Sequence, residues 1–158
     1  MPFADLQREI VAYAPPSLRV LLYRRFMLRI AESLAIRKKA LALVTGDSLG
    51  QVASQTLENL RAVSAVAGLP VFRPLIGTDK EEITTTAREI GTYEISILPD
   101  ADCCTMFVPR HPEIMAGIDQ LERAEGALDV PRLVDAALAA TADETIMPDF
   151  TSAPAKAQ

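Results

Sequence analysis

Three places in this 158-residue sequence combine residue types that can do chemistry. The first is the run from Thr45 to Thr56, where glycines and polar side chains follow a short apolar segment. The second is the pair Cys103 and Cys104, and the third is the pair Arg24 and Arg25. Glycine lets a ligand approach the backbone, thiolates are nucleophiles, and guanidinium groups bind phosphate bidentately. Each place therefore has a functional and a purely structural interpretation.

The glycine-containing run follows a predicted buried strand, and ligands of open α/β sheets bind at the carboxyl ends of strands. We expect a helix to follow and to extend to about Ala67, so that its N-terminal N–H groups suit a phosphate. Gln51 and Gln55 would then share one helix face. The structural alternative is a tight turn in which Asp47 or Ser48 caps the helix. The run contains neither a Walker lysine nor a GxGxxG pattern.

The cysteine pair lies in a polar stretch that also holds His111, the one histidine of the chain. An exposed thiolate could act as nucleophile or sulfur carrier, although the neighbouring Asp100 and Asp102 disfavour the charged form. Two thiols and one imidazole are too few and too irregularly spaced for a zinc site. The structural alternative is two half-buried cysteines in a turn.

Charge is distributed unevenly along the chain. The net charge is −5, but the segment from Ser17 to Lys39 has seven cations and only one acid, Glu32. Two interpretations stay open: a basic helix that pairs with acidic neighbours, or a face that meets phosphate. For Arg24 and Arg25 the structural alternative is a surface salt-bridge pair, which contributes little stability.

Hydrophobic periodicity predicts alternating helices and strands. The expected helices cover residues 2–11, 17–36 (capped by Ser17), about 49–67, 79–90 (burying Ile83, Ala87 and Ile90), 113–125 and 131–140. Thr78 with Glu81, or Asp79 with Glu82 one residue later, fits a capping box at the start of the helix at 79–90. Apolar runs at 41–45 and 69–73 predict strands buried on both faces, which with the helix between them form a parallel crossover unit. Tyr93 to Leu98 is expected as a strand or extended loop.

Composition limits the class of protein. Apolar residues are 49% and charged residues 23%, which are ordinary globular values, and two cysteines exclude a disulfide scaffold. The sequence shows neither a signal-peptide pattern nor a membrane-spanning stretch. We therefore expect a cytoplasmic protein with one domain at 1–150, a disordered tail at 151–158 and no membrane partner.

Several segments resemble one family, the tRNA 4-thiouridine synthetases (tRNA sulfurtransferases, also called thiamine-biosynthesis sulfurtransferases). The resemblance covers about residues 3–138 and is carried by the runs YRRFMLRIAE at 23–32, ALVTGDSLGQVASQTL at 42–57, RPLIG at 73–77, DKE at 79–81, IGT at 90–92 and DCCTMFVP at 102–109. The stretch from Gly46 to Gln55 is the most specific of these.

The resemblance implies an α/β fold, a Rossmann-like PP-loop (adenine nucleotide alpha hydrolase-like) domain with a parallel sheet flanked by helices. It implies ATP-dependent formation of 4-thiouridine in tRNA and, in some members, sulfur transfer for the thiazole of thiamine. By position, the ATP contacts of the family fall on Arg24, Gly46 and Gln55, and its sulfur-handling cysteine on Cys103 or Cys104. ATP with Mg is the expected cofactor, with no tightly bound metal.

The departures from the family pattern set further expectations. The Ser-Gly-Gly-x-Asp-Ser loop, the tRNA-binding ferredoxin-like and THUMP regions and the rhodanese-like domain have no match in these residues. The resemblance therefore implies an incomplete PP-loop domain, catalytically incomplete and weak in ATP binding by itself. Expected partners are tRNA through regions not present here, a cysteine desulfurase as sulfur donor, and either a second copy or the missing N-terminal portion. The alternative is a non-catalytic nucleotide-binding or oligomerisation module that retains the fold.

Overall fold

Helices dominate the computed structural model, which describes residues 2–99, 109 and 111–145. The elements in chain order are α1 (Ala4–Tyr13), η1 (Pro16–Leu18), α2 (Arg19–Arg37), β1 (Leu43–Val44), η2 (Ala53–Gln55), α3 (Leu57–Ser64), β2 (Val71–Phe72), α4 (Lys80–Glu89), α5 (Tyr93–Ser96), α6 (Ile118–Glu125) and α7 (Val130–Ala139), where η marks a short 3-10 helix. The predicted positions of the helices at 2–11, 17–36 and 131–140 are close to these, whereas the helix predicted over 113–125 begins only at Ile118.

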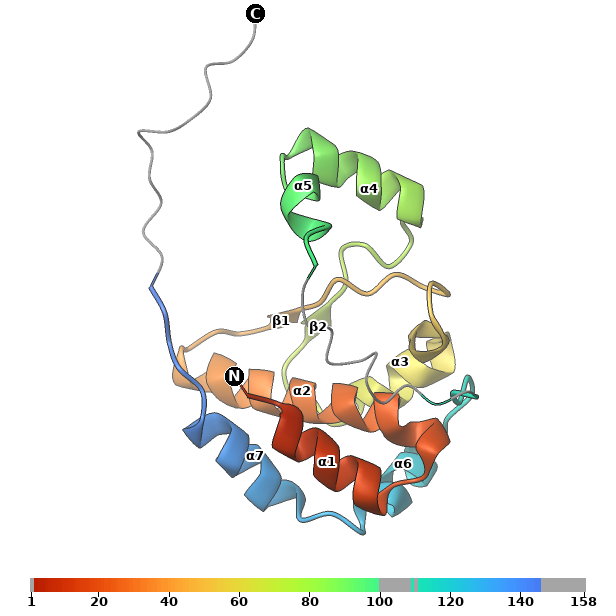
Figure 1. Ribbon diagram of the computed structural model, residues 1–158, viewed down its shortest axis with the longest axis vertical. Coiled ribbons are helices and arrows are strands. Elements are labelled where there is room, and N and C mark those ends of the chain that lie inside the picture. The colour runs from red at the N-terminus through yellow and green to blue at the C-terminus, as the bar shows by residue number, and fades with distance from the viewer. Residues whose placement is uncertain (1, 100–108, 110, 146–158) are drawn as a thin grey trace, which may run out of the picture.

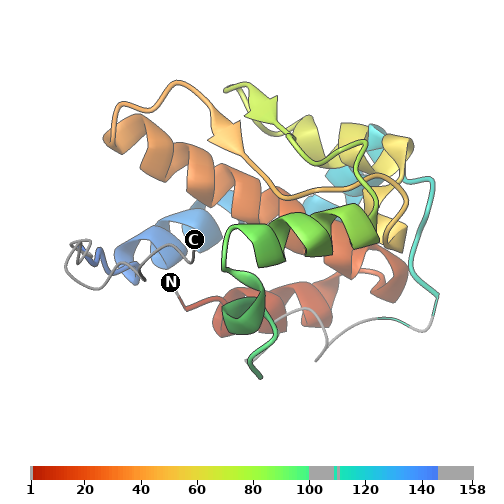
Figure 2. The ribbon, with the colours of Figure 1, turned by 90° about the horizontal axis from the view of Figure 1, so that it is seen from above.

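The long helix α2 organises the fold. It contacts α1, α3, α6, α7 and β1, so most of the chain packs around it. Figure 1 shows these helices gathered on one side of the small sheet, while α4 and α5 stand apart on the other side. Seen from above, the sheet strands and α2 run across the molecule with α4 in front of them (Figure 2). The result is an α/β arrangement in which the helices around α2 pack on one face of a small parallel sheet.

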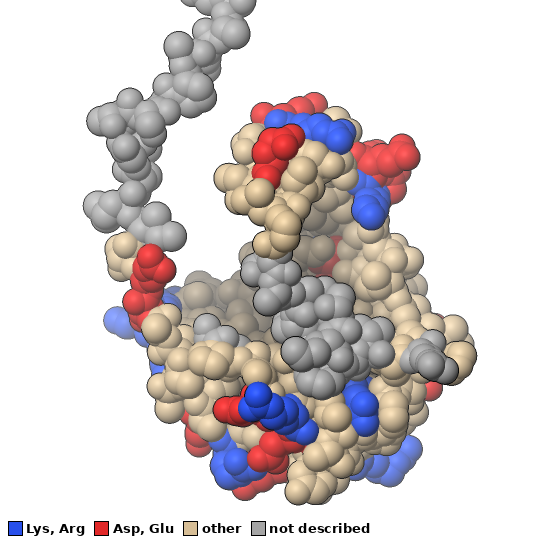
Figure 3. Space-filling model, viewed as in Figure 1, with Lys and Arg blue, Asp and Glu red and all other residues tan. Residues whose placement is uncertain are grey.

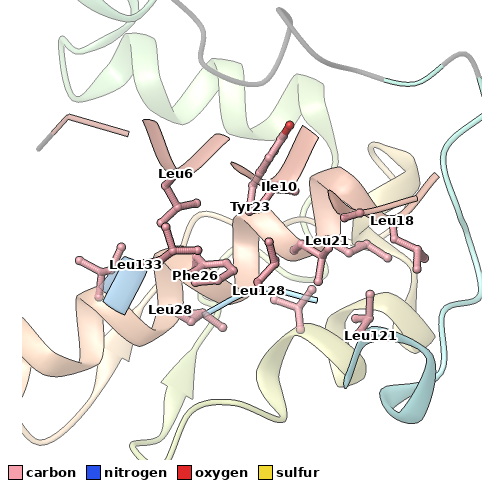
Figure 4. Packing of buried hydrophobic residues seen from close by; sticks show 14 of the residues in the cluster. Leu6, Ile10, Leu18, Leu21, Tyr23, Phe26, Leu28, Leu121, Leu128 and Leu133 are labelled. Carbon is pink, nitrogen blue, oxygen red and sulfur yellow. The ribbon is translucent and has the colours of Figure 1, made fainter. Parts of the chain in front are cut away.

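The core follows the wide apolar stripe of α2. Leu22 and Phe26 are fully buried, and Leu21 is 1% exposed, between helices from both ends of the chain (Figure 4). Tyr23 meets Phe3 of the N-terminal segment edge to face, with 6.2 Å between ring centres. Since each fully buried Leu or Phe stabilises a fold by about 1.5–3 kcal/mol, this stripe fixes how α1, α6 and α7 sit on α2.

The two strands pair in parallel, as the sequence predicts. The register places Leu43 beside Val71 and Val44 beside Phe72. Backbone hydrogen bonds run from Leu43 N to the Pro70 oxygen at 2.8 Å and from Thr45 N to the Phe72 oxygen at 3.0 Å. Because the strands are parallel, both carboxyl ends lie at one edge, which brings the residues after them together.

Burial of the strands on both faces is a prediction that the structure contradicts. Leu43 and Val71 pack against the core, but Val44 is 70% and Phe72 59% exposed. The pleat of a strand explains this difference in exposure, since side chains of neighbouring residues point to opposite faces of the sheet. The helices around α2 cover one face, and nothing in the described part of the chain buries Val44 and Phe72 on the other.

The predicted helix over about 49–67 is also wrong at its start. Gly50 adopts a positive φ of 74°, and the chain then passes through η2 before α3 begins. The Thr56 hydroxyl caps α3 by accepting a hydrogen bond from Asn59 N at 3.2 Å. Gln51 and Gln55 therefore share no helix face, and no helix N-terminus follows Gly46 directly. Ser17 likewise makes no side-chain cap, because η1 precedes α2 and Leu18 occupies the N-cap.

The α4–α5 region combines a confirmed cap with two wrong predictions. Asp79 and Glu82 form the predicted capping box at the start of α4. Burial of Ile90 is contradicted, since it is 68% exposed, and α4 has no buried residue. The segment expected as a strand or loop at Tyr93 forms α5 instead, with Arg88 stacked 4.3 Å from the centre of the Tyr93 ring. These contacts are local to α4 and α5, which explains why they leave the apolar side chains exposed.

The predictions for the cysteine pair and for the C-terminal tail concern residues that the structure does not describe. Cys103, Cys104 and the tail at 151–158 lie outside the described residues. Within the described ranges, none of the helices has the length and apolar character that a bilayer span requires.

Candidate functional site

The carboxylate of Asp47 forms the centre of a polar cluster at the strand ends. Its side chain is only 8% exposed, although it belongs to the loop after β1. Oδ2 accepts hydrogen bonds from the Thr45 hydroxyl at 2.8 Å and from Arg73 Nε at 3.1 Å. Thr45 directly follows β1 and Arg73 directly follows β2, so the parallel pairing itself brings these donors to one carboxylate oxygen.

The other oxygen of Asp47 faces two residues that the sequence singles out. Oδ1 accepts from the Arg24 guanidinium and from Gln55 Nε2, the latter at 3.3 Å. Arg24 comes from α2 and Gln55 from η2. Together with Arg73 after β2, residues from three other segments therefore converge on the Asp47 carboxylate. The second terminal nitrogen of Arg24 donates to the Ser54 carbonyl oxygen at 2.7 Å, which fixes the plane of the guanidinium.

Opposing effects act on the pKa of Asp47. Burial raises that pKa, but the Thr45 hydrogen bond, the charge of Arg24 and the hydrogen bonds from Gln55 and Arg73 outweigh burial. The net pKa lies below the ordinary aspartate value, so Asp47 is ionised at neutral pH. Since an arginine side chain always carries its charge in proteins, the cluster of Arg24, Arg73 and Asp47 holds two cations and one anion.

A cavity of about 510 Å³ opens beside this cluster. Arg24, Asp47 and Gln55 form part of its polar wall, and Glu113 adds a second carboxylate. Val20, Leu21, Val52, Ala53 and Pro112 are among its apolar lining residues. An apolar hollow with a few convergent polar groups is the usual form of a small-molecule site. The combination suits a ligand with an apolar part and a polar part that the Arg24 guanidinium can bind.

Gly46 lies in the exposed loop between β1 and Asp47. A Cβ atom built on Gly46 would meet no described atom within 4 Å. Packing within the described part of the chain therefore does not require glycine here. The open space leaves the backbone accessible to a ligand at the same strand end.

Two other hollows have less suitable chemistry. One of them, about 780 Å³, lies between α3 and α6 and contains side chains of both charges, Glu58, Asp119, Arg61 and Arg123. A smaller one of about 340 Å³ lies between the Ser48 loop and the start of α4. Its helix N–H groups are already taken, since Asp79 accepts from Glu81 N at 2.8 Å and Glu82 N at 2.9 Å. Neither hollow contains the polar cluster around Asp47.

The neighbouring arginines of α2 bind different partners. Arg25 is 2% exposed and donates to both carboxylate oxygens of Glu125 at 2.9 Å. Arg29 donates to the same two oxygens at 2.6 and 2.9 Å. The surface-pair interpretation of Arg24 and Arg25 is thus wrong for Arg25, which is a buried structural residue. The excess charge of α2 is largely paired with acids, as one of the two sequence interpretations expects.

The structure thus brings Arg24, Gly46 and Gln55 together around Asp47. The sequence analysis named Asp47 only as one polar group of the run and missed Arg73. Parallel strands end at the same edge, so residues directly after two paired strands are neighbours, and this signal could have identified Arg73. In the described ranges, no group of three or more His, Cys, Asp or Glu residues is arranged to hold a metal ion.

A parallel strand–helix–strand unit with a ligand-sized cavity at its carboxyl edge defines a Rossmann-like α/β domain. Comparison with known sequences makes the assignment specific. The chain belongs to the family described as thiamine biosynthesis protein (ThiI), whose sequence profile matches residues 1–130.

Known relatives agree with this assignment. A probable tRNA sulfurtransferase of Thermus thermophilus is 58% identical over 138 residues, which are 87% of this chain and 34% of the relative. One of Caldanaerobacter subterraneus is 50% identical over 133 residues, 84% of this chain and 35% of the relative. A solved structure, a 4-thiouridine synthetase–RNA complex with bound ATP, superposes with a TM-score of 0.82 at 45% identity. It matches 87% of this chain and 36% of that protein, so the chain spans about a third of the length of these relatives.

Proposed function

We propose that this chain is part of an ATP-dependent tRNA sulfurtransferase that forms 4-thiouridine in tRNA. The observation that carries the proposal is the convergence of Arg24 and Gln55 on Asp47 beside a cavity of about 510 Å³. Membership of the ThiI family and the similarity to an RNA complex with bound ATP support the same assignment. Sulfur transfer for the thiazole of thiamine is a further activity that the family description favours.

In this proposal Arg24 and Gln55 bind the phosphate chain of ATP, which arrives with Mg. The cluster around Asp47 has an excess of one positive charge, and the open backbone at Gly46 allows a phosphate to approach. The apolar lining at Val20, Leu21 and Val52 suits the adenine ring. Uridine O4 attacks the α-phosphate of ATP and displaces pyrophosphate. The outer sulfur of a cysteine persulfide then attacks C4 and displaces AMP, and a second thiol breaks the S–S bond, which leaves sulfur on the base and a disulfide between the two thiols.

Sulfur delivery is assigned to Cys103 or Cys104. A cysteine persulfide is the expected form of the transferred sulfur, with a cysteine desulfurase as its source. We also propose that this chain is catalytically incomplete without the residues that its longer relatives have. Contacts to tRNA belong to those residues.

A chimera tests the proposed function. The matching third of the Thermus thermophilus relative is replaced by this chain and expressed in a strain that lacks its own tRNA sulfurtransferase. We expect 4-thiouridine to return to bulk tRNA, measured by its near-ultraviolet absorbance and by mass spectrometry of nucleosides. Single Cys103→Ser and Cys104→Ser variants identify the cysteine that handles sulfur. A folded chimera that forms no 4-thiouridine, while the unmodified relative does, would refute the proposal.

A further inference from the structure

We propose that Asp47 is a positioning residue, which orients Arg24 and Gln55 for an anionic ligand by fixing them to the ends of β1 and β2. The inference rests on the proposed function in taking ATP as that ligand. Asp47 itself is buried and anionic, so its role is to hold the groups that meet the ligand.

The two oxygens of Asp47 have different partners. Oδ2 is held by the scaffold, through the Thr45 hydroxyl at 2.8 Å and Arg73 Nε at 3.1 Å. Oδ1 holds the two residues that line the cavity, Arg24 and Gln55. The carboxylate therefore connects the strand ends on one side to the cavity wall on the other.

The scaffold side of this connection is itself fixed. Arg73 Nη2 donates to the Ser64 hydroxyl of α3 at 2.7 Å, and Arg73 Nη1 to the Val71 carbonyl oxygen at 3.4 Å. The Arg73 guanidinium thus donates hydrogen bonds to α3, to β2 and to Asp47, and only 16% of its side chain is exposed. Arg24 differs, because it lines the cavity while Asp47 and Ser54 hold two of its nitrogens.

Charge and orientation predict opposite effects when Asp47 becomes Asn. The substitution raises the net charge of the cluster by one, so a site that attracts ATP by charge alone should bind it more tightly. An asparagine, however, has one acceptor oxygen and one NH₂ donor. It must therefore turn a donor toward either the Arg73 or the Arg24 guanidinium, and in both cases Arg24 loses the charge-assisted hydrogen bond that fixes its orientation. If Asp47 is a positioning residue, Asp47→Asn weakens ATP binding in spite of the added positive charge.

The first measurement is independent of nucleotide. Side-chain NMR of the isotope-labelled chain reports hydrogen exchange of the Arg24 guanidinium and the Gln55 amide. We expect Asp47→Asn to accelerate Arg24 exchange by roughly tenfold or more, as for loss of a charge-assisted hydrogen bond, and Asp47→Glu to restore part of the protection. Asp143→Asn removes the same charge from an exposed pair with Lys38 and serves as the control. Unchanged Arg24 exchange in folded Asp47→Asn would overturn the proposal.

The second measurement adds Mg-ATP at millimolar concentration to the same samples. Weaker binding in Asp47→Asn, with Asp143→Asn unchanged, supports a positioning role, and equal or tighter binding overturns it. If the unsubstituted chain shows no ATP-dependent shift, it does not bind ATP by itself, which agrees with a catalytically incomplete chain, and the exchange data still decide the role of Asp47. Should Asp47→Asn not fold, Thr45→Val removes one scaffold hydrogen bond and must loosen Arg24 by a smaller factor, and unchanged exchange in that variant overturns the proposal.

Discussion

Arg24 and Arg25 show how adjacent residues of one type acquire different roles. Arg24 lies at the rim of a cavity with Asp47, whereas Arg25 is buried against Glu125 and donates to the Ala62 carbonyl oxygen at 2.7 Å. Positions one apart on a helix point in directions about 100° apart, so the sequence pair divides between the site and the core. Residue type alone therefore does not identify which arginine could bind a phosphate.

The first prediction concerns the carboxylate that serves two arginines. Glu125 is 7% exposed on its side chain and accepts two hydrogen bonds from each of Arg25 and Arg29. Glu125→Gln leaves both cations without a counter-charge, which for a buried pair costs about 3–5 kcal/mol of unfolding free energy. Urea unfolding measures this loss. The exposed Asp143→Asn variant is the control and should change little, and a similarly small change in Glu125→Gln would contradict the buried network.

The second prediction concerns acid stability. Burial raises the pKa of Glu125, but the hydrogen bonds and charges of Arg29 and Arg25 together lower it by more. The net pKa lies below the ordinary 4.5. A lowered folded-state pKa gives stability that is present above the ordinary value and is lost as the pH falls through the folded value.

We therefore expect the unfolding free energy to decrease from about pH 5 toward about pH 3, with Asp47 contributing in the same direction. Unfolding experiments across this range, run in parallel on Glu125→Gln, measure the effect. The variant should show a shallower decrease below pH 5. Identical slopes for the two proteins would show that Glu125 titrates normally in the folded state.

At the scale of elements, Asn59 holds together the segments on either side of the candidate site. Its amide donates to the carbonyl oxygens of Ala53 at 2.7 Å and Glu113 at 2.8 Å, and its oxygen accepts from Ala116 N at 2.9 Å. It thereby joins η2, which contains Gln55, to the segment that leads into α6. Since the Asn59 side chain is fully buried, each of these groups depends on it.

The third prediction is that Asn59→Ala costs about 1–3 kcal/mol, because buried backbone groups lose their partners. Hydrogen exchange followed by mass spectrometry should show faster exchange at Ala116 and around η2. Thr84→Ala provides a matched control, since the Thr84 hydroxyl bonds only the Lys80 carbonyl oxygen on exposed α4. Equal effects of the two substitutions would contradict the joining role of Asn59.

Local patterns predict those elements whose stability comes from their own residues and from the shared core. The apolar stripe of α2, the Asp79 cap of α4 and the parallel pairing of the strands were all visible in the sequence. The late start of α3 was not, because the positive φ of Gly50 and the Thr56 cap override a helical hydrophobic pattern. Likewise, Arg24, Gly46 and Gln55 were found by resemblance, while the bridging position of Asp47 depends on long-range contacts that no local pattern encodes.

At the scale of the molecule, one face of the sheet has an uncovered apolar surface. Val44 and Phe72 are paired and exposed, and Leu41, two residues before β1, is 84% exposed. On the face of the molecule that Figure 3 shows, charged side chains gather over α4 and over the helices below it. Contiguous exposed apolar patches in soluble domains mark interaction surfaces. We expect this face to be covered by a second copy of the chain or by the part of the protein that the longer relatives have.

The fourth prediction follows for the chain by itself. It should associate at micromolar concentration, and Val44→Lys should shift it toward monomer, because a charge on the uncovered sheet face opposes burial there. Sedimentation velocity measures both states. Ile36→Lys is the control, since Ile36 is 62% exposed at the end of α2. A stable monomer for the unsubstituted chain would show that this face needs no cover.

The most direct test of the proposed ATP site is the affinity for Mg-ATP of the chimera with Arg24→Ala, by isothermal titration calorimetry. The matched control is Arg37→Ala, which removes the same charge from the exposed end of α2. Loss of a charged hydrogen-bonding group predicts a roughly tenfold to hundredfold weaker affinity for Arg24→Ala and little change for Arg37→Ala. Equal affinities for Arg24→Ala and the unsubstituted chimera, with both folded, would contradict the assignment of the strand-end cluster as the nucleotide site.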